Sequence, residues 1–290
     1  MSYQSVNPAN GESLQTFKET TDQELEAALH AAAACFESWR DLTFAERAGK
    51  NLKQTTLELG GSDAFIVLED ADLEGALKWA LWAKMNNAGQ CCVAAKRLIV
   101  VEAIAGAFLE KLQRAMEALV PGDPMDPATT LAPLSTESAL VNLLEQVERA
   151  MGAGATLVTG GKRIDRPGAY MQPTILTNIK PGNPAFREEF FGPVALTFRV
   201  KDEAEAVALA NDSDYGLGGS IFTQDVPRGQ RLATRMDTGM VFINHPTWTA
   251  SDLPFGGIKN SGYGRELSRL GIQEFVNRKL VRTQSIDAAV

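Results

Sequence analysis

The stretch NNAGQCCVAAKRLIVV, residues 86–101, joins a segment of small and polar residues to a continuous apolar run. The run at 98–101 predicts a strand that is buried on both faces of its sheet. Behind it, Phe108, Leu112 and Met116 recur at a spacing of four and predict an amphipathic helix. A strand followed at once by a helix is the repeating unit of an α/β fold with parallel strands.

Strand-like and helix-like segments alternate from about residue 55 to the end of the sequence. This alternation predicts a mainly parallel sheet covered by helices. We interpret Asp70 as the N-cap of a helix that precedes the stretch quoted above. Further strands are expected over residues 55–59, 155–158, 174–176, 194–200, 220–223, 240–244 and 279–282. Further helices are expected over residues 137–151, 203–210, 227–236 and 267–276.

The N-terminal residues predict a hairpin followed by a helix. Alternating segments within residues 3–18 flank Asn10-Gly11, a strong turn dipeptide. Thr21 and Glu24 form a capping box, which predicts a helix start. Apolar residues then recur at spacings of four and three, which predicts that one helix face is packed. That face consists of Leu25, Leu29, Ala32, Phe36 and Trp39.

The overall composition excludes several classes of protein. The chain has 290 residues, with 28 Lys plus Arg and 36 Asp plus Glu, so its formal net charge is −8. This acidic balance argues against a nucleic-acid-binding protein and against docking on anionic lipid. No apolar stretch approaches the roughly 20 residues of a membrane-spanning helix, and we expect no secretory signal. At roughly 150 residues per domain, the length indicates about two domains.

The three cysteines, Cys35, Cys91 and Cys92, are too few for a disulfide framework, and sequence neighbours pair only with strain. We therefore expect a reducing compartment, the cytoplasm. The two histidines lie far apart in the sequence and no Cys/His cluster has zinc spacing, so no metal site is predicted.

The segment around Cys91 and Cys92 is the first candidate for chemistry. Glycine and alanine let the backbone approach a ligand closely, and a cysteine on such a loop can present a thiolate. The alternative is two packed cysteines in a tight connection. Under mild oxidation the pair either closes a strained bond or traps Cys92 in a mixed disulfide, unless Cys91 only fills space.

Glu58 is the second candidate, because it places a lone carboxylate between Leu57 and Leu59. Burial of an unpaired carboxylate is costly, so this side chain is either solvated at a strand end or functional. The segment FREEFFGP, residues 186–193, is either a ribose-binding edge or a helix end before a turn. Residues 254–266 form a glycine-rich loop before a helix, but the sequence contains no standard dinucleotide or Walker fingerprint.

Five motifs, in the expected order, resemble the aldehyde dehydrogenase superfamily, and its succinate-semialdehyde dehydrogenase group in particular. They are TLELGG (56–61), NAGQCC (87–92), REEFFGP (187–193), YGL (215–217) and PFGG with SG (254–257 and 261–262). FINHPT at 242–247 and GREL at 264–267 carry the resemblance to the succinate-semialdehyde group. The resemblance runs from about residue 50 to the C-terminus and covers residues 6–47 more loosely.

The resemblance implies oxidation of a small aldehyde, such as succinate semialdehyde, to the carboxylic acid with NAD or NADP. Cys92, and not Cys91, matches the nucleophile, which would form a thiohemiacetal and then a thioester. The backbone N–H of Cys92 would help to hold the oxyanion. Glu58 matches the general base that activates the hydrolytic water.

The resemblance also implies a cofactor site. Glu189 matches the carboxylate that accepts hydrogen bonds from the nicotinamide ribose hydroxyls, with Phe191 beside it. Gly60 is expected at the same site. Family members are usually homo-oligomeric, and we expect neither a nucleic-acid partner nor a membrane partner.

A long segment that the family carries between its N-terminal helix and the strand of Glu58 is missing, and residues 47–51 resemble a join between two distant places. By resemblance, the missing part holds most cofactor-binding strands, a second oxyanion donor and the helix start under the pyrophosphate. Loss of one oxyanion donor costs about 10²–10³ in rate, and loss of that helix start removes the main phosphate anchor. We therefore expect weak or absent NAD(P) binding and an exposed edge at residues 55–59.

These observations predict an α/β protein in three parts. Residues 1–61 would be the hairpin, helix and residual strand of a truncated, Rossmann-like cofactor domain. Residues 62–250 would form an aldehyde dehydrogenase-like catalytic domain, and residues 251–290 a glycine-rich loop, helix and assembly strand. Two other functions stay open: a cofactor-independent thiol esterase, and an inactive remnant whose terminal strand pairs with the sheet of a full-length relative.

Overall fold

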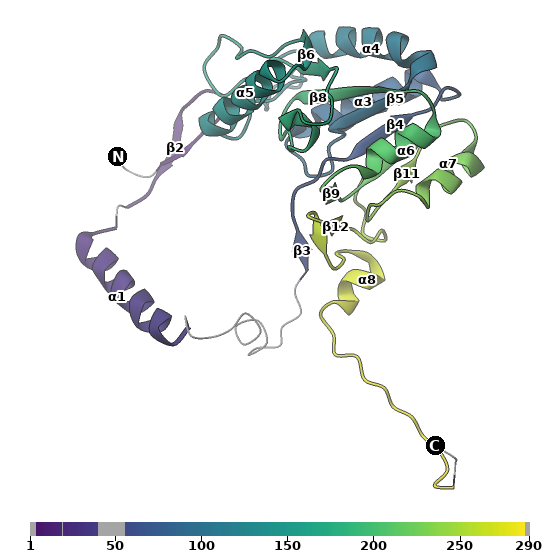
Figure 1. Ribbon diagram of the computed structural model, residues 1–290. Helices are drawn as coiled ribbons and strands as arrows, with labels where there is room; N and C mark the ends of the chain where they lie inside the picture. Colours follow the sequence, from purple (N-terminus) through teal and green to yellow (C-terminus); the bar gives the residue numbers. More distant parts are fainter. Residues whose placement is uncertain (1–3, 19, 40–55, 288–290) are drawn as a thin grey trace.

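The computed structural model describes residues 4–18, 20–39 and 56–287 (Figure 1). Most of this chain forms an α/β body, in which a central sheet lies between two layers of helices. The N-terminal hairpin and helix extend from the body at the end where α5 (Glu137–Gly152) lies. The predicted join at residues 47–51 lies outside the described residues.

The central sheet has seven strands in the order β11-β10-β4-β5-β8-β7-β6. All neighbouring pairs are parallel except β6 and β7, which confirms the predicted mainly parallel sheet. The strands are β4 (Ala64–Val67), β5 (Arg97–Val101), β6 (Thr156–Thr159), β7 (Thr174–Thr177), β8 (Val194–Val200), β10 (Gly219–Phe222) and β11 (Phe242–Ile243). Every residue of β4 and β5 is buried, as expected for central strands covered on both faces.

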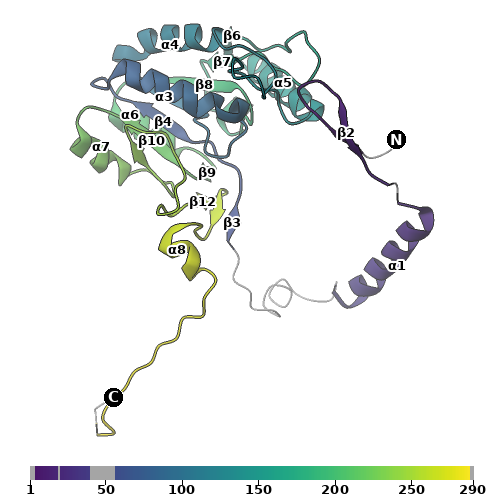
Figure 2. The same cartoon turned by 180° about the vertical axis from the view of Figure 1, so that it is seen from behind.

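Two sets of helices cover the sheet (Figure 2). Buried side chains of α3 (Leu73–Met85) and α4 (Glu102–Glu117) pack with one face, and the predicted stripe Phe108, Leu112 and Met116 is buried there. α5, α6 (Glu203–Asn211) and α7 (Val226–Ala233) pack with the other face.

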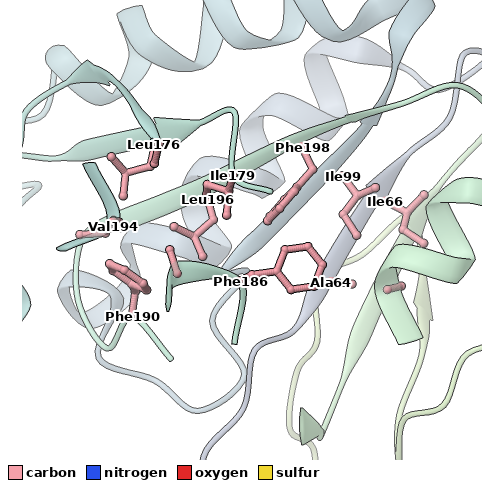
Figure 3. Packing of buried hydrophobic residues seen from close by; sticks show 14 of the residues in the cluster. Ala64, Ile66, Ile99, Leu176, Ile179, Phe186, Phe190, Val194, Leu196 and Phe198 are labelled. Carbon is pink, nitrogen blue, oxygen red and sulfur yellow. The ribbon is translucent and has the colours of Figure 1, made fainter. Parts of the chain in front are cut away.

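The hydrophobic core between the sheet and α5, α6 and α7 includes residues of the segment 186–193. Figure 3 shows Phe186 and Phe190 among side chains of the central strands, near Val194 and Leu196. Phe190 is fully buried in this cluster. Its burial fixes the backbone on which the neighbouring Glu189 is carried.

The strand that carries Glu58 lies outside the central sheet. β3 (Leu57–Glu58) pairs antiparallel with β13 (Gly262–Tyr263), which comes from the glycine-rich segment. A second small ribbon joins β9 (Tyr215–Gly216) to β12 (Ile258–Lys259). The edge expected to be exposed at residues 55–59 is therefore paired within the chain at Leu57 and Glu58, whereas Thr55 is not described.

At the N-terminus, β1 (Gln4–Val6) and β2 (Ser13–Thr16) form the predicted antiparallel hairpin. α1 (Asp22–Trp39) follows the predicted capping box, because the Glu24 N–H donates to Thr21 Oγ1 at 3.2 Å and the Thr21 N–H donates to Glu24 Oε2 at 2.9 Å. The apolar face of α1 was predicted to be packed, but two of its residues are exposed. They are Leu25, 50% exposed, and Leu29, 53% exposed.

Four sequence predictions were wrong or incomplete. The central strand β4 was missed, although Ala64 to Leu68 is a continuous apolar run. The N-cap of α3 is Asp72, whose side chain accepts from the Gly75 N–H, whereas Asp70 accepts from Thr223. Residues 279–282 form no strand, since this exposed segment has no neighbouring strand in the described chain. The preceding helix, α8 (Ser268–Gln273), is shorter than predicted.

Candidate active site

The loop that carries both cysteines connects α3 to β5 at the amino end of the parallel strands. It begins with the short 3₁₀ helix η1 (Asn86–Gly89), in which Asn87 and Ala88 have positive φ. Gly89 also has positive φ, and a Cβ there would lie 2.1 Å from the Gly192 carbonyl oxygen. Only glycine permits this approach, so the cysteine loop packs directly on the backbone of the loop that contains Glu189.

Cys92 and Glu58 lie together at the end of the cysteine loop. The Cys92 thiol donates to Glu58 Oε2, with an Sγ–O distance of 3.7 Å. Burial, reinforced by the negative charge of Glu266, raises the pKa of Glu58. Glu58 Oε1 is buried and accepts no hydrogen bond from any described residue. A carboxyl group with a raised pKa beside a thiol is suited to accept its proton.

Cys91 and Cys92 are free thiols that also contact each other. The hydrogen bond from Cys92 lowers the pKa of Cys91 to about 6, and the Val93 N–H and the Lys96 charge act in the same direction. The same contact, together with burial, raises the pKa of Cys92. The contact between the two thiols thus favours ionisation of Cys91 and disfavours that of Cys92.

Two cavities lie beside the end of α3, and the smaller one reaches Cys91. A cavity of about 90 Å³ is lined by Cys91 together with Trp82, Asn86 and Trp248. Trp82 and Asn86 also line a second cavity, of about 520 Å³. The centroids of the Trp82 and Trp248 rings lie 5.3 Å apart, and both rings line the cavity that reaches Cys91. Sequence reasoning missed Trp82 and Trp248, because only the fold brings residues 247–249 to the end of α3.

Glu189 and Gly60, two of the predicted cofactor residues, are adjacent. Glu189 Oε1 pairs with Lys96 Nζ at 2.7 Å and accepts from the Gly61 N–H at 3.2 Å. A Cβ at Gly60 would lie 2.4 Å from Glu189 Oε2, so glycine at this position leaves that oxygen unobstructed. Phe191, the third predicted residue, is 46% exposed, and Lys96 Nζ lies 5.6 Å from its ring centroid.

Sequence reasoning also missed four buried charged residues around the loop: Asp63, Lys84, Lys96 and Arg97. Lys84 donates to the Phe190 carbonyl at 3.2 Å, and burial lowers its pKa. Asp63 accepts from the Gly218 N–H at 3.0 Å, and burial raises its pKa to about 6. One signal was available: Lys96-Arg97 stands directly before a run read as a strand buried on both faces.

Within the described ranges, no group of three or more His, Cys, Asp or Glu side chains is arranged to hold a metal ion. Likewise, none of the helices described is long and apolar enough to cross a bilayer.

Comparison with known proteins identifies relatives over most of the chain. The sequence profile described as "Aldehyde dehydrogenase family" matches residues 1–49 and 43–281. The succinate-semialdehyde dehydrogenase [NADP(+)] of Deinococcus radiodurans is 56% identical over 238 residues, 82% of this chain and 50% of that protein. A probable succinate-semialdehyde dehydrogenase [NADP(+)] of Synechocystis is 51% identical over 239 residues, 82% of this chain and 53% of that protein.

A solved structure gives the same result. The crystal structure of succinic semialdehyde dehydrogenase from Streptococcus pyogenes in complex with NADP+ matches with a TM-score of 0.80 and 48% identity. The match covers 83% of this chain and 53% of that one. The chain thus spans about half the length of the relatives it matches. Because the family profile matches far more than half of its residues, the chain belongs to the aldehyde dehydrogenase family.

Proposed function

We propose that this chain carries the thiol centre of an NADP-dependent aldehyde dehydrogenase, with Cys92 as nucleophile and Glu58 as general base. The observation that carries the proposal is the 3.7 Å contact between Cys92 Sγ and Glu58 Oε2. The substrate we propose is a small aldehyde of the succinate-semialdehyde type, since relatives that bear this name match 82% of the chain.

In the first step, Glu58 accepts the proton of the Cys92 thiol as the sulfur attacks the aldehyde carbon. A carbon–sulfur bond forms, and the carbonyl oxygen becomes an oxyanion beside the Cys92 N–H. The raised pKa of Glu58 favours this transfer, because a carboxylate whose charge is disfavoured by burial takes up a proton more readily. When bound, the nicotinamide cofactor supplies the hydride acceptor that aldehyde oxidation requires.

In the second step, a thioester on Cys92 is hydrolysed. Between the steps Glu58 releases the first proton to solvent. Deprotonated Glu58 then removes a proton from a water molecule, whose oxygen attacks the thioester carbon. The carbon–sulfur bond breaks, the carboxylic acid leaves, and the Cys92 sulfur takes the proton from Glu58 to regenerate the thiol. One carboxyl group can serve both steps, because Cys92 Sγ and the attacked carbon are joined by a single bond.

The residues present fit the ribose end of a nicotinamide cofactor. Glu189 Oε2 has room beside it because Gly60 has no side chain, so this oxygen can accept hydrogen bonds from the ribose hydroxyl groups. Lys96 and the Gly61 N–H hold the other carboxylate oxygen, which fixes the side chain. We propose this role for Glu189, Gly60 and Phe191. We expect weak NADP binding, because the chain spans half the length of its relatives and we propose that the pyrophosphate-binding segment is absent.

The test is NADPH formation from succinate semialdehyde at millimolar aldehyde and NADP, followed by absorbance at 340 nm with the wild-type chain, Cys92→Ser and Cys91→Ser. We expect slow NADPH formation that is lost in Cys92→Ser and kept in Cys91→Ser. Loss of NADPH formation in Cys91→Ser alone would identify Cys91 as the nucleophile. Cys91 is the alternative because its pKa is lowered. No NADPH from a folded chain would end the dehydrogenase proposal.

A second candidate function is a cofactor-independent thiol esterase. It is favoured because Cys92, Glu58 and the Cys92 N–H lie within the described chain and acyl transfer needs no hydride acceptor. Hydrolysis of p-nitrophenyl acetate by wild type and Cys92→Ser decides it, and equal rates would reject it.

Association with a full-length relative is a third proposal, through the exposed segment 279–284. Co-purification with such a relative would support it, and a strictly monomeric profile would count against it. The division at residues 61 and 250 is likewise proposed, and limited proteolysis tests it.

A further inference from the structure

We infer that Lys96 is a positioning residue that turns the backbone N–H groups of Cys92 and Val93 toward the thiols and ties this loop to Glu189. The effect of Lys96 on catalysis rests on the proposed function. The orientation of the two N–H groups by Lys96 does not depend on it. Lys96 is fully buried, although it carries a long cationic side chain. Burial of such a side chain is costly unless the ammonium group is paired and hydrogen-bonded.

The Lys96 ammonium group has an acceptor for each of its three donors. Nζ donates to the carbonyl oxygens of Cys91 and Cys92, each at 2.7 Å. The third acceptor is Glu189 Oε1, also at 2.7 Å. One side chain therefore holds two consecutive carbonyl groups of the cysteine loop and a carboxylate proposed to bind cofactor.

The two carbonyl contacts determine where two N–H groups point. In a trans peptide the C=O and the following N–H lie on opposite sides of the C–N bond, and the described chain has no cis peptide. Because Lys96 holds the Cys91 carbonyl, the Cys92 N–H points away from Lys96. By the same reasoning, the Val93 N–H points away from Lys96, because Lys96 also holds the Cys92 carbonyl.

The Val93 N–H agrees with this direction, because it lowers the pKa of the Cys91 thiol. The Cys92 N–H donates to no other group in the part of the chain described here. Two neighbouring N–H groups on the sulfur side can stabilise a thiolate or an oxyanion, as backbone N–H groups do in other anion sites. Lys96 thus acts through the backbone, without itself facing the reacting carbon.

Lys84 provides a matched control. It is also a fully buried lysine near the loop, but its Nζ donates to the Phe190 carbonyl and not to the cysteine peptides. Substitution of either lysine by methionine removes a buried charge of similar size. Only the Lys96 substitution releases the carbonyls of Cys91 and Cys92.

The experiment measures the rate of Cys92 alkylation by iodoacetamide against pH, in a Cys91→Ser background and with the modified peptide identified by mass spectrometry. Lys96→Met is expected to raise the pH at which the Cys92 alkylation rate is half-maximal by about one unit or more, since a nearby cation favours the thiolate. Lys84→Met is expected to leave the midpoint within about 0.3 pH unit. Equal profiles for Lys96→Met and the parent, or equal shifts for both lysine variants, would overturn the inference.

Lys96→Gln separates charge from geometry and remains informative if Lys96→Met does not fold. Its amide keeps donors for the carbonyls but carries no charge. In p-nitrophenyl acetate hydrolysis we expect kcat to fall about 10- to 100-fold in Lys96→Met with KM unchanged, and less than about fivefold in Lys96→Gln. An equal fall in both would refute positioning through the backbone. If the parent hydrolyses no ester, the esterase proposal fails, and the alkylation profiles still decide the role of Lys96.

Discussion

Gly61→Ala probes the contact on which the candidate site depends most closely. A Cβ at Gly61 would lie 2.5 Å from the Cys92 carbonyl oxygen and 3.3 Å from the Leu217 side chain. Since Cβ contacts essentially never fall below 3.0 Å, the two segments must separate by about 0.5 Å. The carbonyl that must move is one that Lys96 holds at 2.7 Å, so the strain falls on the cysteine loop.

This overpacking should cost about 1–3 kcal/mol of folding free energy, equivalent to a fall of roughly 3–10 °C in melting temperature for a chain of this size. Ester turnover should fall about tenfold or more, because a displacement near 1 Å at a reacting group costs on the order of 10²-fold. Differential scanning fluorimetry and p-nitrophenyl acetate hydrolysis measure the two effects, and iodoacetamide alkylation of Cys92 gives a readout independent of turnover.

Gly106→Ala is the matched control, because Gly106 lies on an exposed position of α4 and a Cβ there meets nothing within 4 Å. Alanine in a helix interior is favoured over glycine by about 0.5–1 kcal/mol, so this variant should melt slightly higher than wild type. If Gly61→Ala has the melting temperature of wild type and the same Cys92 alkylation rate, the cysteine loop is not held against Gly61 and the geometric argument fails.

Three further predictions concern stability. Phe190→Ala should lower the free energy of unfolding by about 3–5 kcal/mol in urea titration, against less than about 1 kcal/mol for the exposed Phe191→Ala; similar losses would contradict the anchoring of this loop by Phe190. The folded-state pKa of Asp63, raised from 3.8 to about 6, means that its contribution to stability is lost as pH rises from about 4 to 6, and Asp63→Asn should remove that fall. An unchanged pH slope in Asp63→Asn would argue against a buried carboxyl at this position. Arg228→Ala should cost about 1 kcal/mol at low salt and less in 1 M NaCl, because Arg228 pairs with Glu69 and Glu203 on a partly exposed surface.

The sequence predicted the alternating elements well where periodicity and caps agree, as in α4, α5 and β8. It failed where tertiary partners decide. The Asp70 side chain could have capped α3, but it accepts instead from Thr223, directly after β10, and Asp72 caps α3. Residues 279–282 have strand-forming composition, yet a strand needs a neighbour, and the described chain offers none there.

The candidate site was predictable in part. The resemblance pointed to Cys92, Glu58, Glu189 and Gly60, and the fold brings the first two within 3.7 Å. The resemblance assigned no role to Lys96, and the one local signal, its place directly before a buried strand, is ordinarily taken as a solvated strand end. Its burial depends on three acceptors from two distant segments, and no local pattern encodes that arrangement.

The cysteine loop follows the C-terminal end of α3, and the helix dipole there bears on the ionisation of the thiols. α3 ends at Met85, just before the loop, so its carbonyl end, with partial negative charge, lies nearest to the thiols. Many reactive thiols sit instead at a helix N-terminus, where peptide dipoles favour the anion. Here the α3 dipole opposes ionisation, and the compensating positive charge comes from the buried ammonium group of Lys96 and the N–H groups of Cys92 and Val93.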